Sequence, residues 1–140
     1  MRQWSSTSVA ATRAIGAELA VELLPDGALL LVGELGAGKT VLVQGLAAGL
    51  GIDPEEVQSP TYTLMREHRG ARRRMVHLDL YRLEPEDVAA AGFEEVLLGP
   101  GVKAVEWPER MPFVVPGALI LAIERDGERR TIREIPALPG

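Results

Sequence analysis

The feature that most constrains this chain is the octapeptide Gly33-Glu34-Leu35-Gly36-Ala37-Gly38-Lys39-Thr40, which fits the pattern G-x-x-x-x-G-K-[ST]. That pattern is informative only between a strand and a helix. Residues 28–32 form a continuous apolar run, typical of a strand buried on both faces of a parallel sheet. Residues 39–50 carry apolar side chains at helical spacing, and Gly51 ends them. The sequence therefore predicts strand, glycine loop and helix, the arrangement that cradles a phosphate group.

The residue types of this loop match the chemistry of a bound nucleoside triphosphate. Glycines allow the backbone N–H groups of residues 36–40 to curl around a β-phosphate at the positive end of the helix. Lys39 is then expected to reach the β- and γ-phosphate oxygens, and the Thr40 hydroxyl to be a ligand of Mg²⁺. The alternative is a glycine-rich turn without a ligand, which the flanking strand and helix disfavour.

Two acidic residues at the ends of predicted strands are candidates for the remaining chemistry. Asp79 ends the strand-like segment 75–79, and Glu106 ends the segment 102–106. Because the carboxyl ends of parallel strands converge on the phosphate loop, both are expected to hold Mg²⁺ or to position the nucleophile. Thr61 lies in a loop from which a switch threonine reaches Mg²⁺ or the γ-phosphate. A solvated strand cap and an ordinary turn threonine are the alternatives.

Two further features each allow two interpretations. His77 alternates with Asp79 and so shares its face of the strand, but a lone histidine at such a position is more often structural, and we expect that role. The arginines within residues 66–74 would form either an arginine-finger lid over the nucleotide or the solvated tip of a hairpin.

Along the whole chain, helices and strands alternate first and hairpins follow. The expected helices cover 8–24 and 39–50 and start again at Pro85, with an interruption at Gly92. The expected strands cover 28–32, 61–67, 75–80, 102–105, 119–123 and 131–135, with hairpins around 68–71 and over Asp126-Gly127. This order predicts the α/β class, a three-layer P-loop NTPase sandwich with a mixed, partly parallel sheet. A length of 140 residues predicts a single domain, 1–140.

Composition excludes several classes of protein. The absence of Cys removes disulfides, Cys-ligated zinc and thiol nucleophiles, and the absence of Asn removes the Asn-Lys-x-Asp motif that reads guanine. No apolar run approaches the roughly 20 residues that span a bilayer, so we expect a cytoplasmic protein with no membrane partner. A net charge of −5 has the wrong sign for a protein that holds nucleic acid over its whole surface.

Four motifs, in this order and spacing, resemble the bacterial TsaE (YjeE) family: residues 33–40, Ser-Pro-Thr-Tyr-Thr-Leu at 59–64, His-Leu-Asp-Leu-Tyr-Arg-Leu at 77–83 and Val-Glu-Trp-Pro at 105–108. That family is the small ATPase of tRNA threonylcarbamoyladenosine biosynthesis. The resemblance covers nearly the whole chain. It implies Mg²⁺-dependent ATP hydrolysis coupled to the TsaB–TsaD heterodimer, which transfers the threonylcarbamoyl group to adenosine 37 of tRNAs that read codons beginning with A.

The resemblance also implies roles for individual residues. The implied catalytic residues are Lys39, Asp79, Glu106 and Thr61, and the implied Mg²⁺ contacts are Thr40, Glu106 and Asp79. The implied nucleotide contacts are Gly33, Glu34, Leu35, Gly36, Ala37, Gly38, Lys39, Thr40, Val41 and Arg130. A residue near Thr12, and Arg129 as the alternative to Arg130, are further candidates for the nucleotide.

Two positions depart from the family pattern. Glu34 replaces a common Asp and keeps the charge, whereas Val41 replaces a common Thr and offers only its backbone N–H to an α-phosphate. A small-molecule kinase and a nucleotide-gated binding module without turnover stay open as alternative functions. We expect the isolated chain to be a monomer that meets tRNA only inside the partner complex.

Overall fold

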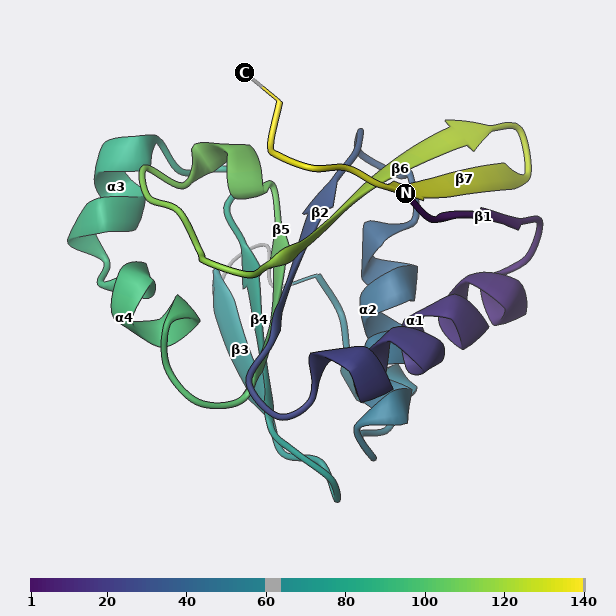
Figure 1. The fold of residues 1–140 in the computed structure, drawn as a ribbon, viewed down its shortest axis with the longest axis horizontal. Coiled ribbons are helices and arrows are strands. Elements are labelled where there is room, and N and C mark those ends of the chain that lie inside the picture. Colours follow the sequence, from purple (N-terminus) through teal and green to yellow (C-terminus); the bar gives the residue numbers. More distant parts are fainter. Residues whose placement is uncertain (60–63, 140) are drawn as a thin grey trace.

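A mixed sheet forms the centre of the computed structural model, which describes residues 1–59 and 64–139 (Figure 1). Within that part of the chain the sheet has seven strands in the order β1-β7-β6-β2-β5-β4-β3. The strands are β1 (Gln3–Ser6), β2 (Ala28–Val32), β3 (Met65–His68), β4 (Met75–Asp79), β5 (Val102–Glu106), β6 (Leu119–Asp126) and β7 (Arg129–Glu134). The helices are α1 (Val9–Leu23), α2 (Lys39–Gly49), α3 (Pro85–Ala90) and α4 (Phe93–Leu97), with 3₁₀ turns η1 (Pro54–Glu56) and η2 (Pro108–Arg110).

The four central strands, β6, β2, β5 and β4, run parallel, and the pairs β1–β7, β6–β7 and β3–β4 are antiparallel. Leu31 and Asp79 are the register partners of Glu106 on its two neighbours. The carboxyl ends of β2, β5 and β4 therefore lie at one edge of the sheet, as expected for a site built around the loop that follows β2.

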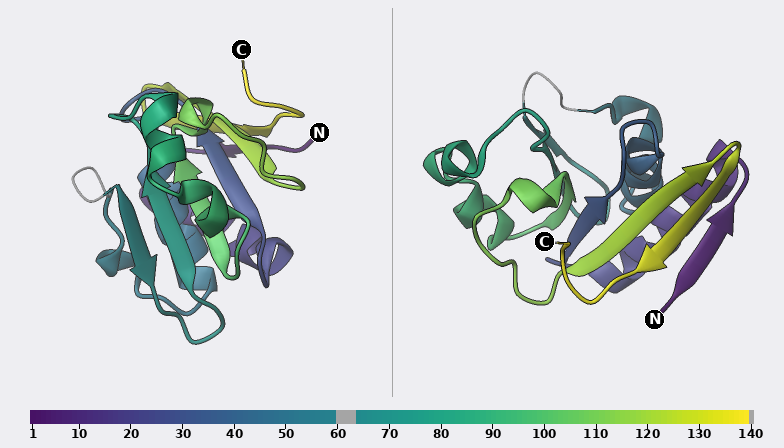
Figure 2. Two further views of the ribbon diagram at one scale, coloured as in Figure 1. Left: turned by 90° about the vertical axis from the view of Figure 1, so that its left-hand side faces the viewer. Right: turned by 90° about the horizontal axis from the view of Figure 1, so that it is seen from above.

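Helices cover both faces of the sheet. The views in Figures 1 and 2 agree that α1 and α2 lie on one side and α3 and α4 on the other. Along β2, Leu29 and Leu31 join the core beneath α1 and α2, whereas Leu30 joins the core on the α3 and α4 side. The apolar run of β2 is thus buried on both faces, and the predicted three-layer α/β architecture is confirmed.

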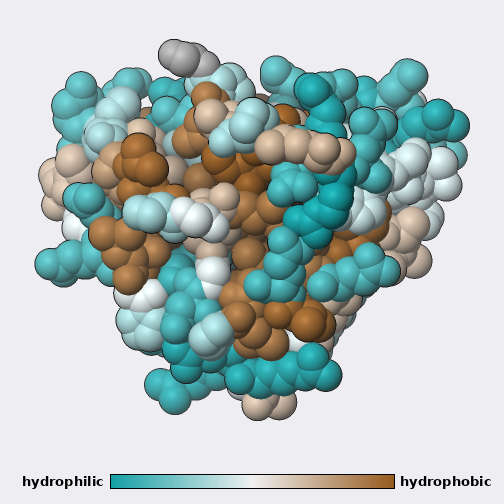
Figure 3. All heavy atoms as spheres, viewed as in Figure 1, coloured by the Kyte–Doolittle hydropathy of each residue, from teal (hydrophilic) through white to brown (hydrophobic). Residues whose placement is uncertain are grey.

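The face toward the viewer in Figure 1 carries an apolar hollow. Figure 3 shows hydrophobic side chains gathered in the middle of this face. A cavity of about 320 Å³ is lined there by residues of the η2–β6 loop and of the carboxyl-terminal segment, Phe113, Val115 and Leu138 among them. None of the helices in residues 1–59 and 64–139 is long and apolar enough to cross a membrane.

Helix α1 fixes the position of α2. Ser8 caps α1 by accepting a hydrogen bond from the N–H of Ala11 at 3.0 Å, and α1 then packs closely along α2. A Cβ atom added at Gly16 would lie 2.3 Å from the carbonyl oxygen of Leu42, and one at Gly45 would lie 2.1 Å from that of Arg13. The two helix backbones therefore touch at glycines, which sets the start of α2 and with it the glycine loop.

The amino-terminal strand β1 was not expected from the sequence, because three of its four residues are polar and Trp4 alone makes no apolar alternation. It pairs with β7 through backbone hydrogen bonds. Strands β6 and β7 also extend further than predicted, to Asp126 and from Arg129, so their turn consists of Gly127 and Glu128 rather than Asp126 and Gly127. The polar ends of these two strands lie beyond the core, where hydropathy does not reveal strand pairing.

The arginine-rich hairpin lies far from the glycine loop. Its tip precedes β4, and β4 runs parallel to β2, so tip and loop occupy opposite ends of the sheet (Figure 1). Arg73 contacts the Asp26 carboxylate at 2.6 Å, and Arg74 contacts that of Glu67 at 3.0 Å. The tip residues Arg73 and Arg74 therefore form no arginine-finger lid over the nucleotide. They tie the tip to neighbouring loops instead, through the carbonyl oxygens of Pro25 and Pro100.

Candidate functional site

The glycine loop leads into the amino end of α2 with a backbone that only glycine adopts easily. Gly36 has φ of 76° and Gly38, the residue before the helix, has φ of 107°. The residue before the helix is a glycine, and no side chain among the described residues caps α2 there, although the first N–H groups of any helix lack partners within it. Donors and the positive end of the helix dipole therefore face the loop, which favours an anion.

Lys39 is a buried cation at the mouth of this loop. The residue is only 5% exposed. Its Nζ donates a hydrogen bond to the carbonyl oxygen of Gly33 at 2.6 Å and lies 3.9 Å from the ring centroid of Trp107. Burial lowers the pKa of Lys39. Among the described residues Lys39 forms no ion pair, and its direct contacts are a carbonyl dipole and an aromatic ring. The carboxylates of the site, Glu106 and Asp79 among them, act on its charge from a longer distance.

Thr40 and Glu106 lie in contact across the edge of the sheet. The Thr40 hydroxyl donates to the Glu106 carboxylate, with oxygen–oxygen distances of 3.1 and 3.3 Å. His77 Nε2 lies 2.6 Å from Glu106 Oε2, with both side chains buried. Because an ionised carboxylate only accepts, we assign the proton to Nε2. His77 Nδ1 has no hydrogen-bond partner within the described part of the chain. His77 therefore orients Glu106, a contact that the expected structural role did not include.

Asp79 is the second carboxylate at this edge. It is 7% exposed, and its two oxygens accept from the Ser59 hydroxyl at 2.8 Å and from the N–H of Tyr81 at 3.0 Å. Register pairing places Asp79 beside Glu106, as the sequence predicted. The sequence assigns Ser59 no role beyond its place in the motif at 59–64, and the structure adds its contact with Asp79. Thr61 lies outside the described residues.

The side chains of Lys39, Thr40, Asp79 and Glu106 line one cavity of about 540 Å³. Trp107 forms part of the wall of this cavity. Its backbone has a φ of 61°, a conformation that is rare for a bulky residue and that occurs most often at functional sites. Its ring lies 4.8 Å from that of Tyr81 and above Lys39 Nζ. Sequence reasoning did not assign a role to either ring. The available signal was a Trp-Pro pair directly after the strand-terminal Glu106.

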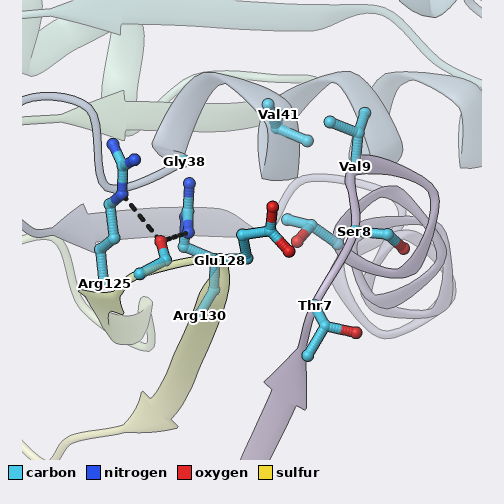
Figure 4. Close-up of a pocket in the computed structure, with 10 residues that line it drawn as sticks. Thr7, Ser8, Val9, Gly38, Val41, Arg125, Glu128 and Arg130 are labelled. Carbon is cyan, nitrogen blue, oxygen red and sulfur yellow. Dashed lines mark hydrogen bonds between the residues drawn. The ribbon is translucent and has the colours of Figure 1, made fainter.

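A second cavity of about 310 Å³ adjoins the first (Figure 4). It lies between the start of α1 and the β6–β7 turn, and it shares Gly38, Val41 and Arg130 with the first cavity. Arg130 thus lies at the predicted site, whereas the alternative, Arg129, follows the strand alternation to the opposite face. The Thr12 hydroxyl is buried and hydrogen-bonded to that of Ser6 at 2.7 Å.

The oxygen donors at the edge of the sheet fit a Mg²⁺ ion that is bound together with the phosphates of a nucleotide. The Thr40 hydroxyl and the carboxylates of Glu106 and Asp79 are hard oxygen donors that line the same cavity. Mg²⁺ is usually held by one or two such groups together with substrate phosphates. In residues 1–59 and 64–139 no group of three His, Cys, Asp or Glu side chains could hold a metal ion by itself. The arrangement fits a metal–nucleotide complex.

Comparison with known proteins gives consistent results. A family model described as "Threonylcarbamoyl adenosine biosynthesis protein TsaE" matches residues 6–135. The chain is 48% identical over 103 residues to the tRNA threonylcarbamoyladenosine biosynthesis protein TsaE of Nostoc sp., covering 71% of this chain and 63% of that protein, hence less than two thirds of the relative's length. It is 36% identical over 127 residues to the Bacillus subtilis protein of the same name, covering 90% and 79%. A crystal structure of Bacillus subtilis YdiB superposes with a TM-score of 0.71 at 30% identity, covering 94% of this chain and 82% of that one.

Proposed function

The chain belongs to the TsaE family of threonylcarbamoyladenosine biosynthesis proteins, and we propose that it serves this tRNA modification by binding and hydrolysing ATP with Mg²⁺. One observation carries the proposal. An uncapped helix terminus, a buried lysine without a carboxylate partner and a hydroxyl–carboxylate pair at 3.1 Å open into the same cavity. A phosphate chain with its metal is the ligand that would satisfy all three groups.

Each residue then has a defined task. Lys39 exchanges its bond to the Gly33 carbonyl for the β- and γ-phosphate oxygens, which a charged donor prefers to a neutral acceptor. Thr40 and Glu106 would hold Mg²⁺, and the charge of the bound ion would offset that of the phosphates. Asp79, already fixed by Ser59, orients the attacking water. His77 keeps the Glu106 carboxylate in place. The backbone of residues 33–41 surrounds the phosphates.

The nucleoside part of ATP is proposed to occupy the second cavity, because Val41 and Arg130 line both cavities and so join the two. Adenine is the proposed base, in keeping with a chain that contains no Asn and hence no Asn-Lys-x-Asp motif for guanine. The walls contributed by α1 and by the β6–β7 turn would then contact the sugar and the base.

The TsaB–TsaD heterodimer is the proposed partner. Support comes from the family's place in threonylcarbamoyladenosine biosynthesis. The net charge of −5 favours contact with tRNA through the complex rather than by the isolated chain. We propose that the protein is cytoplasmic and monomeric and that it acts while bound to the TsaB–TsaD heterodimer. A measurement of its molecular mass in solution tests the monomeric state.

Replacement of Lys39 tests the nucleotide assignment. A charge-assisted hydrogen bond contributes about 1.5 to 3 kcal/mol, so Lys39→Ala should weaken ATP binding about 10- to 100-fold and abolish phosphate release. Binding is measured by calorimetry, products by chromatography, and folding by circular dichroism. A folded Lys39→Ala protein with unchanged binding and turnover would remove the assignment.

The products of the wild-type protein separate the candidate functions. Free phosphate supports the ATPase. A phosphorylated small molecule would indicate a kinase instead, and bound nucleotide without any turnover would indicate a nucleotide-gated binding module.

A further inference from the structure

Two arginines face each other at the end of the β6–β7 hairpin. Arg125 on β6 is the register partner of Arg130 on β7. Two positions further in, Ile123 is the partner of Ile132, and both are buried in the core beneath α1 and α2. Because side chains alternate along a strand, the arginines share the face of these isoleucines and extend it past the core to the glycine loop.

Both guanidinium groups are anchored to a single carbonyl oxygen. Arg125 Nε and Arg130 Nη1 each donate to the carbonyl of Gly127, at 3.0 Å in both cases. Figure 4 shows the two side chains side by side, pointing from the hairpin toward Gly38. A Cβ atom added at Gly36 would lie 3.8 Å from Arg125 Nη1, and one at Gly38 would lie 3.5 Å from Arg130 Nε. A side chain at either glycine would therefore touch one of the arginines, so the pair lies next to the loop with little room between them.

Neither arginine of this pair has a carboxylate partner in residues 1–59 and 64–139. Like charges directly opposite each other destabilise an antiparallel pair of strands. On the other face of the hairpin, Arg133 contacts the Glu124 carboxylate at 2.6 Å, so the hairpin neutralises arginines elsewhere. Neither Arg125 nor Arg130 forms an ion pair with any carboxylate of the described residues, although Glu128 lines the same cavity. The fold thus holds two repelling cations against a loop that favours an anion.

We propose that Arg125 and Arg130 form a clamp for the phosphate chain of a nucleoside di- or triphosphate. The clamp lies on the side of the glycine loop that faces the second cavity, the nucleoside cavity. The inference rests on the proposed function and adds a second set of phosphate donors to Lys39. Arg130 lines both cavities and so meets the phosphates where they leave the loop, and Arg125 lines the nucleoside cavity next to it. Guanidinium groups bind phosphate oxygens through paired N–H donors, and a bound anion removes the repulsion between them.

Single replacements by serine test the clamp, with ADP and Mg²⁺ as the probe. Arg125→Ser and Arg130→Ser should each raise the Kd for ADP about tenfold or more by calorimetry. Arg129→Ser is the matched control, because it removes the same charge from the same hairpin. Arg129 is the register partner of Asp126, and strand alternation places it on the opposite face of the hairpin from Arg130. Its Kd should stay within about threefold of wild type, since salt screens exposed charges.

Thermal unfolding without nucleotide separates a binding role from a structural one. Relief of the repulsion predicts that Arg125→Ser and Arg130→Ser melt at or above the wild-type temperature. Affinities equal to that of Arg129→Ser would overturn the clamp. Weaker binding together with a lower melting temperature would also overturn it, because the arginines would then merely support the loop. A wild-type protein that binds no ADP would instead overturn the proposed function and the clamp with it.

Discussion

Replacement of Gly16 by alanine tests whether the α1–α2 contact positions the glycine loop. The added Cβ would lie 2.3 Å from the Leu42 carbonyl oxygen, 2.7 Å from the Leu46 nitrogen and 3.0 Å from the Gly45 carbonyl carbon. Carbon contacts settle near 3.5 Å, so the helices must separate by about 1 Å. All three atoms are backbone, which places the overpacking cost at the upper end of about 1 to 3 kcal/mol. Alanine's higher helix propensity returns about 1 kcal/mol, so the expected net loss is about 2 kcal/mol.

This loss is measured by urea denaturation and by thermal unfolding, where it corresponds to a fall of about 6 to 8 °C. Ala14→Gly, at an exposed position of α1, isolates the propensity contribution in the same helix and should cost about 1 kcal/mol. Because α2 carries Lys39 and Thr40, Gly16→Ala should also weaken ATP binding. A Gly16→Ala protein as stable as wild type would refute the reasoning, since a rigid backbone contact would then be absent.

Three further outcomes are expected. Glu106→Gln should fold normally but lose Mg²⁺-dependent phosphate release, because an amide keeps the shape and loses the charge; wild-type turnover would reduce Glu106 to a strand cap. His77→Leu should need more Mg²⁺ for half-maximal phosphate release than His77→Gln, which keeps a donor for Glu106; equal Mg²⁺ requirements would contradict the orienting role. Burial lowers the pKa of His68 below its ordinary value of 6.5. As pH drops, the unfolded chain therefore takes up a proton at this residue before the folded chain does, so the free energy of unfolding of the wild type should fall below pH 6.5. His68→Gln should show a smaller fall in denaturation curves at pH 7 and pH 5, and identical curves would refute it.

The structure around the candidate site that the sequence predicted correctly is the part encoded locally. The strand, glycine loop and α2 are contiguous, and their pattern of apolar residues and glycines states the geometry directly. Asp79 and Glu106 could be placed at the loop because the ends of parallel strands converge wherever the strands lie in the sheet. The family resemblance, carried by four short motifs, is confirmed by the family model and by relatives along most of the chain.

Other features depend on sheet order and register, which no local pattern contains. His77 reaches Glu106 only because β4 and β5 are neighbours with Asp79 opposite Glu106. Arg125 faces the loop only because β6 and β7 continue pairing past their apolar residues, and a register shifted by one residue would turn it to the other face. Trp107 covers Lys39 through a left-handed backbone conformation, which propensity disfavours for such a side chain.

The most direct test of the central claim is phosphate release from ATP and Mg²⁺ by this chain, measured with and without the TsaB–TsaD pair and in parallel for Lys39→Ala. The account predicts that the partner pair increases release by the wild-type chain and that Lys39→Ala shows none in either condition. A wild-type chain that binds ATP but releases no phosphate with the pair present, or a Lys39→Ala chain that releases it equally well, would contradict the account.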